Sequence, residues 1–141
     1  MARRGTGGAG FGGLTVDDAA RWATVVGWVS LAFGLFLTTA PRRGAALMGF
    51  GDRPRLGRAV GVGDVAIGAG LLLDHDRARW LETRALGNVA IAGLCGWALA
   101  AGTPRPGRAG ALLALMAGLT PVDGLVARRL RSATTDRAPG T

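Results

Sequence analysis

Apolar and small residues are grouped into four long runs, and charged residues lie mainly between the runs. Each run is close in length to the roughly 20 helical residues that cross a hydrocarbon core about 30 Å thick. Two runs carry no charge, and the aspartates Asp64 and Asp123 lie inside the other two. The pattern predicts an all-α protein, a bundle of four transmembrane helices over residues 22–40, 57–73, 85–103 and 109–127.

Capping and turn residues agree with these limits. Thr15 and Asp18 fit a capping box at the start of the first helix, and Pro41 is expected to end it. Asp76 is suited to cap the third helix, and a turn rich in glycine and proline at 102–107 separates the third helix from the fourth. The loops are therefore expected to be short.

Composition supports a membrane protein rather than a soluble domain. Hydrophobic residues make up 49% of the chain and glycine contributes 25 of the 141 residues, so apolar residues and glycine together far exceed the usual share of about 45–50%. The terminal segments differ, because they contain mainly glycine, arginine and small polar residues. We expect one membrane domain at 15–131 between disordered tails at 1–14 and 132–141.

Small residues recur every three or four positions in each run. Lipid provides no hydrophobic force between helices, so close backbone approach along such faces is expected to hold a bundle together. We therefore expect four buried faces, which comprise Ala23, Gly27, Ser30, Gly34 and Thr38; Gly57, Gly61, Asp64 and Gly68; Ala85, Asn88, Ala92 and Cys95; and Gly110, Ala114, Ala117, Pro121 and Gly124.

Asp64 is a candidate functional residue, because an intramembrane carboxylate is costly. It either exchanges protons or is structural, neutral or paired with Arg55, Arg58 or a hydroxyl group. With a rise of about 1.5 Å per residue, Asp64 and Asp123 lie about 13 Å apart along the membrane normal. A shared carboxylate dyad is therefore not expected.

Asp123 is expected to have different partners. Asn88, near the start of the antiparallel third span, lies at about the depth of Asp123, with Arg84 and Arg21 toward the same side. We predict a polar cluster of Asn88, Asp123 and one of these two arginines.

No pattern in the chain indicates catalysis, a cofactor or a metal ion. The glycine-rich residues 5–10 lack a preceding strand, and the absence of lysine excludes a P-loop. Residues 74–76 are interpreted as a solvated turn, because consecutive residues rarely converge on one ion, and Cys95 as a packing residue. The protein is therefore not expected to be an enzyme.

The number and positions of the arginines indicate whether the chain contacts nucleic acid or lipid. The formal charge is +8, but arginines flank the apolar runs instead of lining one face with interleaved aromatics, which argues against nucleic acid and for contact with the lipid bilayer. The termini and the middle link hold the larger share of the arginines, so the positive-inside rule places both termini in the cytoplasm. The chain is expected to be a multi-pass protein of the cytoplasmic membrane.

One segment resembles a known family. Residues 58–64, Arg-Ala-Val-Gly-Val-Gly-Asp, followed by Gly-Ala-Gly-Leu-Leu-Leu at 68–73, are similar to the start of the second helix in a family of small four-helix bacterial membrane proteins of unknown function, DoxX-like in size and layout. The overlap covers about residues 16–131. The resemblance implies an integral membrane protein and no particular activity.

Two functions are consistent with these observations. The first is a non-enzymatic structural or partner-binding membrane component, which packs as a homo-oligomer or against another membrane protein. The alternative is a small transporter or proton-conducting element that uses Asp64.

Overall fold

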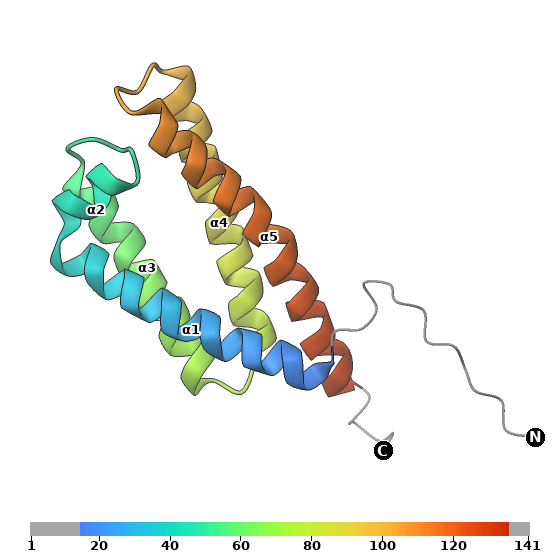
Figure 1. The fold of residues 1–141 in the computed structure, drawn as a ribbon. Helices are drawn as coiled ribbons and strands as arrows, with labels where there is room; N and C mark the ends of the chain where they lie inside the picture. The colour runs from blue at the N-terminus through green and yellow to red at the C-terminus, as the bar shows by residue number, and fades with distance from the viewer. Residues whose placement is uncertain (1–14, 136–141) are drawn as a thin grey trace, which may run out of the picture.

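The structure, a computed structural model, describes residues 15–135, and within this range all regular structure is helical (Figure 1). The all-α prediction is therefore confirmed. The helices are α1 (Val16–Thr39), α2 (Pro41–Leu47), α3 (Pro54–Leu73), α4 (Arg77–Ala100) and α5 (Pro106–Thr135).

The expected end of the first helix is confirmed, whereas the expected start of the C-terminal tail is wrong. Pro41 ends α1 but also opens the short helix α2, because proline is preorganised for the first turn of a helix. The tail expected from residue 132 begins too early, since α5 continues to Thr135. The expected tails otherwise lie outside the described residues.

The predicted caps are present. The Thr15 side chain accepts a hydrogen bond from the Asp18 backbone N–H at 3.1 Å, and Asp18 bonds back to Thr15, which completes the capping box. Asp76 accepts from the Arg79 N–H at 3.1 Å and begins α4. The α4–α5 turn requires Gly102, whose φ of 73° is a conformation that other residues rarely adopt.

Three helices are long and apolar enough to cross a membrane, over Val16–Thr39, Pro54–Leu73 and Pro106–Ala133. Their outer surfaces are apolar, and Trp28, Val62 and Leu125 are each more than half exposed. Monomeric soluble proteins rarely expose large contiguous apolar surfaces. The structure therefore supports a membrane-spanning protein with three candidate spans. The expected fourth span, α4, is long enough at 24 residues but is not among them.

The helices are arranged as two antiparallel pairs. α1 packs along α3 and α4 along α5, whereas contacts between the pairs are far fewer (Figure 1). Small residues allow the close approach of α1 and α3, because a Cβ added at Gly34 would lie 2.6 Å from the backbone nitrogen of Val65 and 2.7 Å from the oxygen of Gly61. The expected small-residue faces of these two helices are buried, with Thr38 and Asp64 partly so.

The expected small-residue face of α5 is wrong. Ala114, Ala117 and Pro121 are exposed, and nothing lies within 4 Å of a Cβ added at Gly110 or Gly124. The helix instead buries a different face against its neighbours, made by Ala109, Asp123, Val126 and Ala127. In a helix rich in alanine and glycine, small residues occur on more than one face, so their spacing alone does not identify the buried one.

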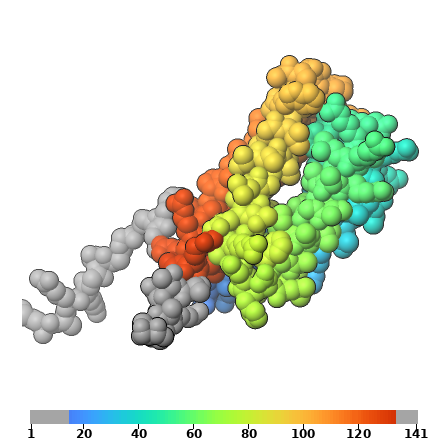
Figure 2. Space-filling view, turned by 180° about the vertical axis from the view of Figure 1, so that it is seen from behind, coloured from blue at the N-terminus to red at the C-terminus, as the bar shows by residue number. Residues whose placement is uncertain are grey.

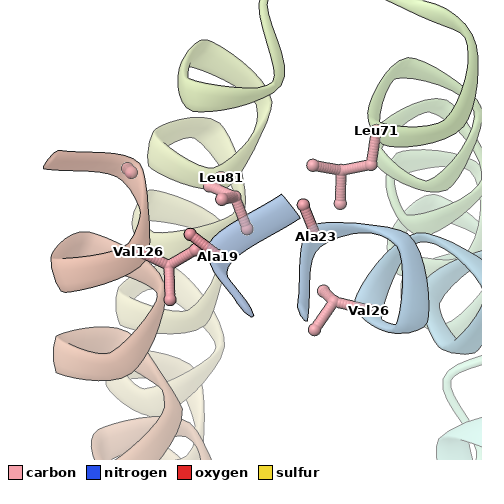
Figure 3. Packing of buried hydrophobic residues seen from close by; sticks show 7 residues of the cluster. Ala19, Ala23, Val26, Leu71, Leu81 and Val126 are labelled. Atoms are coloured by element: carbon pink, nitrogen blue, oxygen red, sulfur yellow. The ribbon is translucent and has the colours of Figure 1, made fainter. Parts of the chain in front are cut away.

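The apolar core is divided into two clusters at opposite ends of the pairs. Figure 3 shows the first, in which Ala19, Ala23, Leu71, Leu81 and Val126 bring all four long helices together near the start of α1. The second contains Leu37, Ala45, Met48, Phe50 and Cys95 near α2. At that end the link after α2 also joins the α4–α5 turn, since Thr103 donates a hydrogen bond to the Gly49 carbonyl. Polar residues and a cavity lie between the clusters.

Candidate functional site

A buried ion pair is the centre of the polar layer. Arg84 of α4 forms a salt bridge with Asp123 of α5, whose side chain is completely buried. Asn88, one turn after Arg84, donates from Nδ2 to Oδ2 of Asp123 at 3.0 Å. The structure therefore brings together the cluster expected from the sequence, with Arg84 as its arginine. Arg21 lies elsewhere, exposed beside Asp18 and Trp22 at the start of α1.

Arg84 also joins the two helix pairs. Its Nε donates to Oγ of Ser30 in α1 at 3.2 Å. Ser30 was identified in the sequence only as part of a small-residue face, although its hydroxyl group was a signal for a polar contact. The second carboxylate oxygen of Asp123, Oδ1, is buried and has no hydrogen-bond partner within the described residues.

Asp64 faces a cavity of about 220 Å³ that lies between the helix pairs. Figure 2 shows the molecule hollowed between α3, in green, and α4, in yellow. Arg84 and Asn88 line the same cavity, whereas Asp123 does not, so the two aspartates form no shared dyad. Within residues 15–135 no hydrogen bond or ion pair engages the Asp64 carboxylate, and the charged group that acts on it is Arg84.

The expected partners of Asp64 among the nearby arginines are wrong. Arg55 and Arg58 lie on the exposed side of α3, where they line a surface groove with Arg42 and Arg43 from α2. Arg58 lies six residues before Asp64, which is roughly 120° around a helix, so the two side chains point in different directions. The groove, with four arginines and no acidic lining residue, was not recognised in the sequence.

The link between α3 and α4 is a solvated turn. Asp74 accepts hydrogen bonds from the Asp76 backbone N–H at 3.0 Å and from the Trp80 indole at 2.8 Å. These two bonds, the backbone bond first, hold the pKa of Asp74 below its usual value because they favour the ionised carboxylate. Within the described part of the chain no group of three or more His, Cys, Asp or Glu side chains is placed to hold a metal ion. Cys95 is buried in the second apolar cluster.

Comparison with known proteins gives no match, whether to a family model, to a curated protein or to a solved structure. The site comprises a buried ion pair inside the bundle and, beside it, a cavity whose wall carries the unengaged carboxylate of Asp64.

Proposed function

We propose that the chain is a multi-pass protein of the cytoplasmic membrane whose four long helices all span the bilayer, and that it acts without catalysis by packing against a second membrane chain. The second chain is either another copy or a different protein. The observation that carries the proposal is the outward face of α5, where small residues are exposed along a helix apolar enough to span.

The outward face of α5 has the features of a helix-packing surface. Ala114, Gly118 and Pro121 lie on one side of the helix and are exposed, and nothing lies within 4 Å of a Cβ added at Gly118. Such residues let a second backbone approach closely in lipid. Pro121 also lacks the N–H that would bond the Ala117 carbonyl, and an unpaired carbonyl is costly where only lipid surrounds it.

Inclusion of α4 among the spans is supported by where its polar groups point. Arg84 and Asn88 reduce the hydropathy of α4, but both bond inside the bundle to Ser30 or Asp123. From Leu86 onward the outer surface of the helix is apolar, as Leu86, Val89, Leu94 and Trp97 are exposed. An intramembrane charge is tolerated when it faces protein and is paired, so α4 meets the requirements of a span.

Cysteine labelling tests the number of spans. In a Cys95→Ala background, single cysteines replace Asp52, His75 or Pro104, which are exposed in the three links between the long helices. Four spans with cytoplasmic termini predict that an impermeant maleimide labels positions 52 and 104 on intact cells and position 75 only after permeabilisation. If α4 does not cross, positions 75 and 104 are labelled under the same condition, and the four-span proposal is wrong.

Cross-linking tests the packing surface. In the same background, Ala114→Cys on α5 is oxidised in membranes, and we expect a cross-linked dimer or an adduct with a partner of different mass. Gly118→Leu should abolish the cross-link because the added side chain blocks close approach. Gly93→Leu is the matched control, since Gly93 is exposed on α4 and nothing lies within 4 Å of its added Cβ. An equal loss of the cross-link in Gly118→Leu and Gly93→Leu would contradict a role for this face of α5 in packing.

A second candidate function is proton conduction through Asp64. It is favoured by the position of this carboxylate, on a cavity wall and without a hydrogen-bond partner in the described residues. Asp64→Asn should then abolish pH-driven proton flux in proteoliposomes while the protein still folds. Unchanged flux would reject this function.

A further inference from the structure

We infer that the cavity between the helix pairs binds a small organic cation, an ammonium group on an apolar body about the size of one aromatic ring. The inference goes beyond the proposed packing function. It depends on the cavity alone and requires neither a partner chain nor a particular number of spans.

The cavity has the size and lining for such a body. Its volume is about 220 Å³, and its walls are mainly aliphatic and aromatic, with side chains from all four long helices that include Val29, Phe33, Val60, Ile91 and Leu112. A buried apolar cavity of about 150 Å³ already holds benzene, whereas drug-sized ligands occupy about 300–1,000 Å³. The space therefore fits one ring with a short chain.

The polar wall of the cavity presents hydrogen-bond acceptors. The Asp64 carboxylate is an acceptor when ionised, and it lines the cavity unengaged. Asn88 donates its amide N–H to Asp123, which leaves its carbonyl oxygen as an acceptor. The Ser30 hydroxyl of the same lining can accept a second hydrogen bond beside that from Arg84. An ammonium group carries three donors and no acceptor, which matches a lining that offers several acceptors.

The balance of charge favours a cation over an anion. Arg84 is the only positive group among the lining residues, and it is committed to Asp123 by a salt bridge and to Ser30 by a hydrogen bond. With this pair neutralised, the carboxylate of Asp64 leaves the wall with one net negative charge. A bound cation would supply the direct ion pair and hydrogen bond that the Asp64 carboxylate lacks within the described residues.

Three probes that share a phenyl ring and differ in charge test the inference. The full chain is placed in zwitterionic nanodiscs, and binding of 2-phenylethylammonium is measured by calorimetry against empty nanodiscs. The neutral analogue 2-phenylethanol and the anion phenylacetate are measured in the same way. We expect the cation to bind about tenfold or more tightly than either analogue, because hydrogen bonds to charged groups are worth at least that factor. Equal binding of the alcohol would overturn the inference.

Two variants locate the site. Asp64→Asn should lower the affinity for the cation about tenfold or more and remove its advantage over the alcohol. Asp52→Asn, which removes an exposed carboxylate outside the cavity, is the matched control and should bind as the unmodified protein does. If both variants lower affinity equally, the attraction is not specific to the cavity and the inference is wrong.

A third variant keeps the inference testable if Asp64→Asn does not fold. Ile91→Phe leaves every charge in place and fills part of the cavity, so it should also abolish binding of the cation. Unchanged binding in a folded Ile91→Phe protein would place the cation elsewhere. Neither result alters the labelling pattern at positions 52, 75 and 104, so failure of this inference is distinguishable from failure of the proposed function.

Discussion

Arg84 and Asp123 form a buried salt bridge in which each charge is compensated by the other. Asp123 is completely buried and its salt bridge with Arg84 is assisted by Asn88, while Arg84 reaches Ser30 on the other helix pair. Removing one member of a buried pair is costly because the other charge is left uncompensated, whereas replacing both with apolar residues often costs little. We therefore expect the pair to contribute more to the choice of helix partners than to net stability.

The effect of breaking the pair is predicted to depend on whether one or both charges are removed. Asp123→Leu alone should lower the free energy of unfolding by about 3–5 kcal/mol, and the double variant Arg84→Leu/Asp123→Leu should lower it by much less. Asn88→Leu removes one donor and should cost about 1–3 kcal/mol. Thermal unfolding in one detergent checks all three. A double variant less stable than Asp123→Leu would contradict the explanation, as would an Asn88→Leu protein of unaltered stability.

Asp74 gives a pH-dependent prediction. Its hydrogen bonds lower its pKa in the folded protein, so its stabilising contribution is present above the usual aspartate pKa of about 3.9 and is lost as the pH falls through the lowered value. The thermal midpoint of Asp74→Ala should therefore lie below that of the unmodified chain at pH 6. The difference should shrink progressively below about pH 4. A difference that is constant from pH 6 to pH 2.5 would show that ionisation of Asp74 is irrelevant.

At the scale of the helices, the sequence predicts positions well and orientations less well. The long apolar runs and the capping residues Thr15 and Asp76 place the helices, because both signals are local. The short helix α2 is missed because Pro41 ends one helix and begins another with the same residue. The buried face of α5 is missed because small residues occur around most of that helix.

The candidate site also has one part that could be predicted from the sequence and one part that could not. Asn88 and Asp123 could be paired from the sequence because antiparallel helices convert residue number into depth, and the structure joins them. The environment of Asp64 could not be predicted, because the cavity exists only where the two helix pairs diverge. Proximity along the chain favoured Arg55 and Arg58 as its partners, but both lie on another side of α3.

The α1–α3 contact gives a prediction at the scale of the helix pair. Gly34→Ala should destabilise the protein, because the new Cβ would lie within 3 Å of backbone atoms of both Val65 and Gly61 and would force the helices apart. Gly63→Ala is the control, since Gly63 is exposed and nothing lies within 4 Å of its added Cβ. The control should be neutral or more stable by up to about 1 kcal/mol, the gain in helix propensity. The measurement is the unfolding midpoint of each variant. Equal midpoints for Gly34→Ala and Gly63→Ala would rule out close packing at Gly34.

At the scale of the whole molecule, arginines are present at both ends of the helix pairs. Arg42, Arg43, Arg55 and Arg58 form the groove at the end that carries α2. Near the opposite end, Arg131 pairs with Glu82. If the helices span a bilayer, both groups lie near lipid head groups, and guanidinium groups bind phosphate well.

The groove is predicted to increase affinity for anionic lipid. Arg42→Gln/Arg55→Gln should reduce the retention of phosphatidylglycerol relative to phosphatidylcholine, measured by native mass spectrometry of the purified protein. Each basic residue near an anionic surface contributes about 1 kcal/mol, so the loss should be roughly tenfold or more. Arg21→Gln/Arg79→Gln removes the same charge from exposed positions near the other end. An equal loss in both double variants would indicate general attraction without a groove.

The division into helix pairs also bears on how the protein is made. Each pair completes most of its packing internally, and residues 74–76 between α3 and α4 form the covalent link between the pairs. We therefore expect the two halves of the chain to insert as separate units, before the polar contacts of Arg84 join them. The chain can be divided at His75 into two fragments that are synthesised from separate messages in one cell. These fragments should then reassemble into the complete molecule.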